Sequence, residues 1–188
     1  MNVYDFDNTI YDGESALDFF KFYLRRDPSL LRFVPRVLKA FRKYKKGEVT
    51  IERALSDYAG EVEDYYRKMT DADDAVREFW DAHIKNIKPF YYELHRDDDL
   101  IITASPDVSM KEICSRLGVT RCICTTFDSE TGKIDRLCFR ENKVKAYFEI
   151  YGDTPIENFY TDSLNDSPLI EISENAFLVK GGRMEKIK

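Results

Sequence analysis

The sequence predicts an α/β protein, in which a parallel sheet carries a long helical insertion after its first strand. Three observations indicate this class. A short apolar stretch opens the chain at 2–6, a helical pattern fills 15–88, and strand-like and helix-like segments alternate from 89 onward. Such alternation is typical of parallel sheets, because each crossover between parallel strands needs a connection long enough for a helix.

The opening strand and the helical block follow from their local patterns. Residues 2–6 (NVYDF) form an apolar run that leads into turn residues. Within 15–88, apolar residues recur three or four positions apart, as on one face of a helix. Ser15 with Asp18 three residues later predicts a helix start, and Pro89 predicts the end of the block. Further boundary signals inside the block are Asp27 before Pro28, Gly47 and Thr50.

The remainder of the chain predicts four strands, three helices and a small hairpin. The strands are expected at 99–105, 121–127, 158–162 and 175–179, and the helices at 106–118, 141–152 and 165–173. A hairpin is expected at 126–139, where a Thr-Gly pair separates two strand-like runs.

Composition and charge exclude several classes of protein. With 188 residues, of which 43% are hydrophobic, the chain can bury a core in one domain or in a core plus a small insert. A formal net charge of -6 argues against a surface that coats nucleic acid. No stretch approaches the roughly 20 apolar residues of a membrane span, and the start lacks a signal-peptide pattern. We therefore expect a cytoplasmic protein.

The four cysteines show no paired spacing typical of a metal site. We expect them to be buried as small apolar side chains, since a cytosolic chain of this size needs no disulfides. Cys122 and Cys124 alternate as two residues on one face of a strand would.

Polar side chains follow several expected strands, at the edge where ligands bind in open parallel sheets. They are Asp5 and Asp7, then Thr103 and Ser105, then Asp162, Ser163, Asn165 and Asp166, with Lys143 near the start of a helix. Each acid alone is more simply a helix cap or turn residue. Together they predict a Mg²⁺ site, because clustered carboxylates repel one another unless a cation is bound. The lysine and hydroxyls could then hold a phosphate, and one carboxylate could attack phosphorus.

Four segments in order carry a resemblance to a known family. They are DFDNT (5–9), IITAS (101–105), NKVK (142–145) and TDSLND (161–166). With them the chain resembles the haloacid dehalogenase-like phosphatases, in the branch that includes phosphoserine phosphatase. The resemblance implies a Rossmann-like catalytic core at 1–13 and 89–188, and a helical cap at 14–88.

The resemblance also implies the roles of the site residues. Asp5 would be the nucleophile and a Mg²⁺ ligand, and Asp7 the general acid and base, with its backbone carbonyl on the metal. Asp162 and Asp166 would complete the metal site. Thr103 and Lys143 would contact the transferring phosphoryl group, and Ser105 and Asn165 are further expected substrate contacts. Dehalogenases of this superfamily lack the second aspartate, so the presence of Asp7 favours a phosphatase.

The substrate is expected to be a small phosphorylated metabolite, enclosed by the cap. Glu14 stands where phosphoserine phosphatases direct a glutamate at the substrate amine. Tyr58 lies near the position of their carboxylate-binding arginine, and only Arg53 is close. This departure argues against phosphoserine itself.

Two alternatives accompany these expectations. A non-hydrolytic phosphoacceptor, such as a response-regulator receiver, also uses clustered aspartates, a threonine and a lysine. Its phosphoacceptor lies mid-chain and it has no cap, which favours the phosphatase. The basic amphipathic stretch at 32–46 could contact anionic lipid or an acidic partner, although a solvated outer face of the cap is the simpler interpretation.

Overall fold

The computed structural model describes residues 1–35, 39, 42–43, 71–128, 130–131 and 133–188. In chain order the elements are β1 (Asn2–Tyr4), α1 (Ser15–Tyr23), the 3₁₀ helix η1 (Pro28–Phe33), α4 (Ala72–His83), η2 (Ile84–Asn86), α5 (Pro89–Leu94), β2 (Leu100–Pro106), α6 (Asp107–Leu117), β3 (Arg121–Phe127), β4 (Ile134–Arg136), α7 (Glu141–Tyr151), β5 (Ile156–Thr161), η3 (Leu164–Asp166), α8 (Ser167–Ile172), β6 (Ser173–Lys180) and β7 (Arg183–Lys186).

The described strands form one seven-stranded sheet in the order β4-β3-β2-β1-β5-β6-β7. The five strands from β3 to β6 are parallel, as the sequence predicts. β4 pairs antiparallel with β3, which confirms the hairpin, and β7 adds an antiparallel edge that the sequence analysis did not include. β1 lies in the middle, where Val3 pairs with Leu100 on one side and Phe159 on the other.

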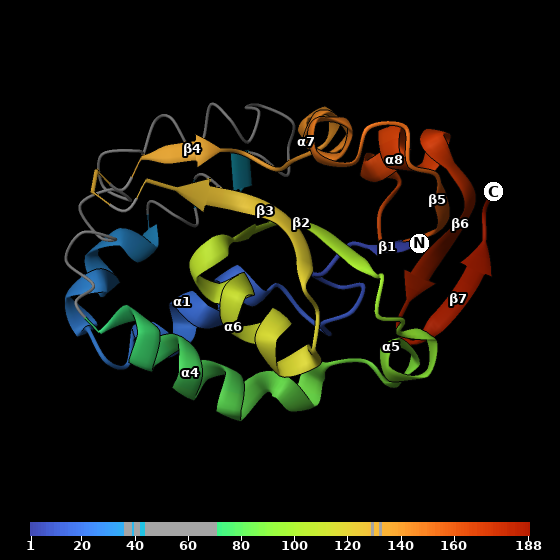
Figure 1. Ribbon diagram of the computed structural model, residues 1–188. Helices are drawn as coiled ribbons and strands as arrows, with labels where there is room; N and C mark the ends of the chain where they lie inside the picture. Colours follow the sequence, from blue (N-terminus) through green and yellow to red (C-terminus); the bar gives the residue numbers. More distant parts are fainter. Residues whose placement is uncertain (36–38, 40–41, 44–70, 129, 132) are drawn as a thin grey trace.

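Helices cover both faces of this sheet. In Figure 1, α1, α4 and α6 lie on one side, and α7 and α8 lie on the other. Successive residues of the central strands point to opposite layers, so Tyr4 and Ile101 join the first core while Val3 and Ile102 join the second. A largely parallel sheet between two layers of helices confirms the predicted α/β class.

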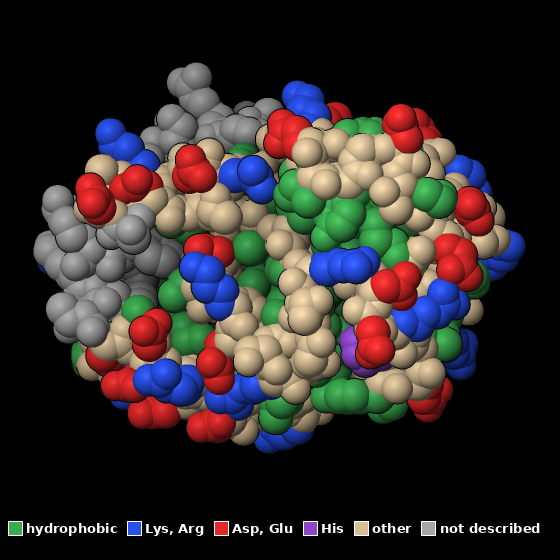
Figure 2. Space-filling model, viewed as in Figure 1, with side chains coloured by type: hydrophobic (Ala, Val, Ile, Leu, Met, Phe, Trp, Pro, Cys, Tyr) green, Lys and Arg blue, Asp and Glu red, His purple; other side chains and the backbone are tan. Residues whose placement is uncertain are grey.

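In the helix α4, the apolar spacing places the hydrophobic side chains on one buried face. Ala75, Val76, Phe79 and Trp80 share one face and are buried. The Trp80 indole also donates from Nε1 to the carbonyl of Ser109, at 3.0 Å, which joins α4 to α6. In Figure 2, charged side chains spread around the visible face, while hydrophobic side chains floor a hollow near α6 and β3.

Two expected helix boundaries need correction. Ser15 is not the cap of α1, because the helix begins at Ser15, and the N-cap residue is Glu14, whose side chain makes no capping bond. Pro89 closes the predicted block but is also the first residue of α5, where proline's missing N–H costs nothing. The Asp27 cap is confirmed, since its side chain accepts from the amide of Ser29.

Other expectations fall outside the described residues. Gly47, Thr50, Arg53 and Tyr58 are among them, as is most of the basic stretch at 32–46. The division into a core and a cap at 14–88 therefore stays a prediction. Among the helices described, none combines the length and apolar character needed to cross a membrane.

Candidate active site

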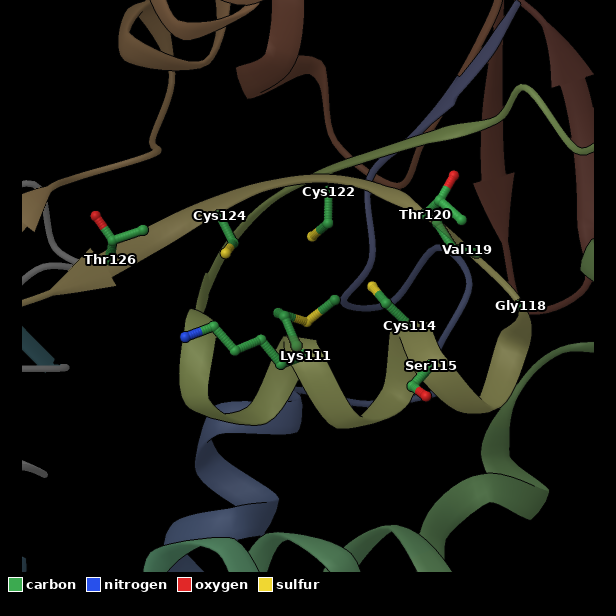
Figure 3. Close-up of a pocket in the computed structure, with 10 residues that line it drawn as sticks. Lys111, Cys114, Ser115, Gly118, Val119, Thr120, Cys122, Cys124 and Thr126 are labelled. Atoms are coloured by element: carbon green, nitrogen blue, oxygen red, sulfur yellow. The ribbon is translucent and has the colours of Figure 1, made fainter.

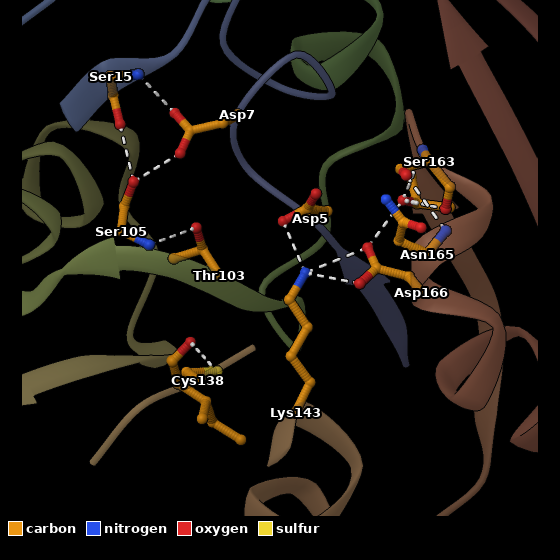
Figure 4. A network of polar contacts seen from close by, with 12 residues as sticks. Asp5, Asp7, Ser15, Thr103, Ser105, Cys138, Lys143, Ser163, Asn165 and Asp166 are labelled. Atoms are coloured by element: carbon orange, nitrogen blue, oxygen red, sulfur yellow. Dashed lines mark hydrogen bonds and ion pairs between the residues drawn. The ribbon is translucent and has the colours of Figure 1, made fainter. Parts of the chain in front are cut away.

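Two carboxylates share one lysine at the ends of β1 and β5. Lys143 Nζ lies 3.0 Å from Asp5 Oδ1 and 3.1 Å from Asp166, and only 4% of the lysine side chain is exposed (Figure 4). Asp166 also accepts from the hydroxyl of Thr161 at 2.9 Å. Lys143 of α7 is thus in direct contact with the residue that follows β1 and with the last residue of η3, although the three are far apart in sequence.

Burial and mutual repulsion perturb the charges of this cluster. Burial raises the pKa of Asp5 to about 7; Lys143 opposes this rise, and Asp166 adds to it. Burial by itself would lower the pKa of Lys143, but the two carboxylates outweigh it and raise that pKa above its usual range. The site therefore places a permanent cation between two acids, of which Asp5 is held close to the point of protonation near neutral pH.

Asp7 lies in a separate network of hydroxyl and amide donors. Its Oδ1 accepts from the backbone amide of Ser15 at 2.7 Å, and its Oδ2 accepts from Ser105 Oγ at 2.5 Å (Figure 4). The two serine hydroxyls are 3.0 Å apart, and since the Ser105 proton points to Asp7, Ser15 is the donor between them. Burial raises the pKa of Asp7, while the bonds from Ser105 and Ser15 oppose that rise.

Thr103 and Ser105 occupy the end of β2, beside the two aspartates. Thr103 is buried, and its hydroxyl oxygen accepts from the backbone amide of Ser105 at 3.1 Å. This contact fixes the turn that directs the Ser105 hydroxyl at Asp7. The Thr103 proton is not used in this bond, so it remains available for an acceptor such as a phosphoryl oxygen.

The segment after β5 supplies a fourth acid, Asp162. Asp162 is partly exposed, and burial and the charge of Asp166 raise its pKa. Among the described residues, no side chain donates a hydrogen bond to its carboxylate. Asn165 is exposed, and its backbone amide donates to the Ser163 hydroxyl at 3.2 Å.

Glu14 lies at the entrance to α1. It is exposed, and its Oε1 accepts from the side-chain amide of Asn8 at 2.8 Å. Asn8 directly follows Asp7 and has a positive φ of 57°, which turns the chain sharply after the aspartate pair. Glu14 is therefore connected to the loop that carries Asp7.

Two residues near the site were missed by the sequence analysis. Ser15 was treated only as a helix cap, but it binds Asp7 through its amide and Ser105 through its hydroxyl. Lys88 is 7% exposed, and its ammonium donates to the carbonyl of Asn8 and lies 3.9 Å from Asp12. Burial lowers the pKa of Lys88, whereas the charges of Asp12 and Asp162 oppose that effect. A lone lysine ahead of Pro89 gives no sequence signal of this kind.

The oxygen donors near the site suit Mg²⁺ by their chemistry. Asp5, Asp162 and Asp166 are acids at neighbouring strand ends, and burial or like charge raises the pKa of the first two, which a bound cation would relieve. Among the described residues, no three Cys, His, Asp or Glu side chains are already gathered as a metal site. A set of two carboxylates, one backbone carbonyl and water does not require such a group.

Comparison of the sequence with models of protein families gives one match. The model of the haloacid dehalogenase-like hydrolases matches residues 3–171. The chain belongs to this family. The match spans the strand ends that carry the aspartates and Thr103, and the helix α7 that carries Lys143. Membership makes the protein a hydrolase of the haloacid dehalogenase-like family and agrees with the resemblance seen in its four motifs.

Solved structures show the same fold at low identity. A protein of unknown function from Bordetella pertussis Tohama I is 22% identical, with a TM-score of 0.64, over 94% of this chain and 87% of its own. A haloacid dehalogenase family hydrolase from Salmonella enterica serovar Typhi is 12% identical, with a TM-score of 0.66, over 91% of this chain and 59% of its own. A phosphoserine phosphohydrolase-like protein from Francisella tularensis is 16% identical, with a TM-score of 0.61, over 94% of this chain and 86% of its own. No curated protein is similar enough to count as a match.

Proposed function

We propose that this hydrolase is a Mg²⁺-dependent phosphatase that cleaves small phosphomonoesters through a phosphorylated Asp5. One observation carries the proposal: Asp5 and Asp7 are two residues apart in sequence yet lie in networks of different chemistry. Asp5 contacts the ammonium of Lys143, whereas Asp7 accepts hydrogen bonds from Ser15 and Ser105. A nucleophile and a proton carrier need such differently tuned acids side by side.

In the first step, an oxygen of Asp5 attacks phosphorus and the bond to the leaving oxygen breaks. Asp7 gives its proton to that oxygen, and the raised pKa caused by burial keeps the proton available. Thr103 donates to the phosphoryl group, and Lys143 offsets its negative charge. Bound Mg²⁺ would supply further positive charge at the phosphoryl oxygens, held by the carboxylates of Asp5 and Asp162 and the backbone carbonyl of Asp7, with Asp166 acting through water.

In the second step, water attacks the phosphoryl group on Asp5. Asp7, now ionised, takes a proton from that water, and the bonds from Ser15 and Ser105 stabilise its charge meanwhile. Phosphate leaves and Asp5 is restored. The same carboxyl thus acts first as an acid and then as a base.

The substrate class follows from the position of Glu14. Its carboxylate lies at the start of α1, next to the loop of Asp7 and Asn8. An acid there favours a leaving group with an amine or hydroxyl. We propose a small phosphorylated metabolite of this kind, and the solved neighbours described as phosphoserine phosphatases support it by fold alone.

The test is incubation of the full chain with a generic aryl phosphate and Mg²⁺. We expect sustained turnover and a phosphoenzyme on Asp5 that disappears with Asp5→Asn. A single stoichiometric phosphorylation with no turnover would instead support a phosphoacceptor protein. Wild-type rates in the Asp5→Asn variant would refute the mechanism.

A further inference from the structure

Two lysines are buried among the described residues, Lys88 and Lys143. A buried ammonium loses its water, and this cost must be offset by acceptors or by opposite charges. Lys143 meets this need between two carboxylates. Lys111, on the rim of the pocket between α6 and β3 (Figure 3), instead stays exposed and pairs with Asp107 at 3.1 Å. The burial of Lys88 close to the aspartates therefore needs an explanation of its own.

Lys88 lies where two connecting segments run side by side. Tyr11 and Ile87 form an antiparallel bridge, and the backbone amide of Lys88 donates to the carbonyl of Ile10 at 2.8 Å. The segment before α1 is thus paired with the segment after α4, and Pro89 begins α5 directly afterwards. The backbone on both sides of Lys88 is held, which fixes the place from which its side chain extends.

The side chain of Lys88 reaches the loop that follows β1. Its ammonium donates to the backbone carbonyl of Asn8 and lies 3.9 Å from Asp12 Oδ1. The negative charges of Asp12 and Asp162 stabilise the ammonium and offset part of the cost of its burial. No other described residue accepts a hydrogen bond from it, so the Asn8 carbonyl is its one direct acceptor in this part of the chain.

The Asn8 carbonyl belongs to the turn that places Asp7. Asn8 has a φ of 57°, a left-handed conformation that is uncommon for residues other than glycine. Its amide closes the loop by donating to the carbonyl of Gly13 at 2.9 Å. A shift of this turn would carry Asp7 Oδ2 away from Ser105 Oγ, which now donates to it at 2.5 Å. A donor that holds the Asn8 carbonyl therefore also holds the Asp7 carboxyl in place.

We propose that Lys88 is a positioning residue, which holds the Asp7–Asn8 turn through the Asn8 carbonyl so that the Asp7 carboxyl is directed at the leaving group. This inference rests on the proposed function, in which Asp7 carries the proton. Lys88 itself moves no proton, and its effect on the rate passes through Asp7. Its loss should therefore matter most for a substrate whose leaving group needs protonation.

The experiment measures phosphoenzyme formation by the full chain with Mg²⁺, using propyl phosphate and nitrophenyl phosphate. Lys88→Met keeps most of the side-chain length and removes the donor. It should slow propyl phosphate about tenfold, the effect of one lost hydrogen bond to a charged group, and slow nitrophenyl phosphate much less. Lys85 is the matched control, because it lies three residues earlier in η2 and is exposed. Lys85→Met should match the wild type with both substrates.

A double variant tests whether Lys88 acts through Asp7. Ser105→Ala removes another contact that places Asp7, so the loss in Lys88→Met combined with Ser105→Ala should be clearly smaller than the product of the two single losses. If Lys88→Met does not fold, Lys88→Gln, with a shorter polar side chain, should show the same dependence on the leaving group. Equal losses on both substrates, or single losses that simply multiply, overturn the proposal.

Hydrogen exchange tests the turn without any substrate. The amides of Asn8 and Tyr11, which donate to the carbonyls of Gly13 and Phe6, should exchange faster in the folded Lys88→Met variant than in the wild type or in Lys85→Met. Unchanged exchange at these two amides overturns the proposal. A wild type without turnover would instead refute the proposed phosphatase, and the exchange rates would still decide whether Lys88 holds the turn.

Discussion

Ser105 and Ser109 form a matched pair that tests the hydrogen bonds of the Ser105 hydroxyl, the shorter of which goes to Asp7 and the other to Ser15. Both serines are 3% exposed. Ser105 Oγ donates to Asp7 Oδ2 at 2.5 Å, whereas Ser109 Oγ has no hydrogen-bond partner among the described residues. Replacement by alanine therefore removes the same atom from two equally buried positions, but only one of them touches the proposed acid.

The structure sets the expected size of the effect. A hydrogen bond to a charged group contributes about 1.5–3 kcal/mol, which corresponds to roughly 10- to 150-fold in rate if the loss falls on the transition state. Ser105→Ala should slow turnover within this range. Ser109→Ala should leave turnover unchanged and stability equal or higher, since it removes a buried hydroxyl with no partner.

The assay measures the rate of phosphoenzyme formation with two substrates. An alkyl phosphate needs a proton from Asp7 as its leaving group departs, but a nitrophenyl phosphate hardly does. Ser105→Ala should therefore slow the alkyl substrate much more than the nitrophenyl substrate. Equal losses on both substrates, or equal losses in the two serine variants, would refute the role given to the Ser105–Asp7 bond.

Three further predictions concern single residues. Asp162→Ala should raise the Mg²⁺ concentration needed for half-maximal activity and weaken Mg²⁺ binding in calorimetry, and unchanged metal dependence would contradict its place as a ligand. Glu14→Gln should change selectivity across a panel of phosphorylated amino acids, amino alcohols and sugars with little effect on a generic aryl phosphate; a uniform loss would show a structural role. Burial raises the pKa of Asp99 in the folded protein. The contribution of the Asp99 proton to the free energy of unfolding is therefore complete below the unfolded pKa of about 3.9, and it is lost as the pH rises through the pKa of the folded state. Urea unfolding of Asp99→Asn and wild type should therefore show the variant gaining relative stability from about pH 4 upward, and a constant difference would be the contrary result.

The strands and the site acids could be predicted because their signals are local. β2, β3, β5 and β6 are apolar runs of ordinary strand length bounded by turn residues, and Asp5 and Asp162 directly follow the strands β1 and β5. Strand direction then brings the acids to one edge without any knowledge of packing. Lys143 was singled out by its place near the start of a predicted helix, and the family motif then implied its role.

The missed features depend on contacts between distant segments. The bond between Ser15 and Ser105 joins residues 90 positions apart, so Ser15 read alone is a typical cap residue. The role of Lys88 depends on the carbonyl of Asn8, a backbone atom with no sequence signature. β7 is exposed along its whole length, so it lacks the apolar alternation by which strands are recognised.

The central position of β1 has a consequence for the order of folding. The strand that leads to Asp5 is made before the other strands of this sheet, but Asn2 pairs with Asn158, 156 residues further along the chain. During synthesis β1 has no partner strand on its β5 side until β5 has emerged. Pairings between strands so far apart in sequence are slow to form. The aspartate pair would therefore be assembled late, so that a nascent or truncated chain ending before β5 exposes an unpaired strand edge and has no working site. Chaperone dependence should accordingly be greatest for chains that end before β5.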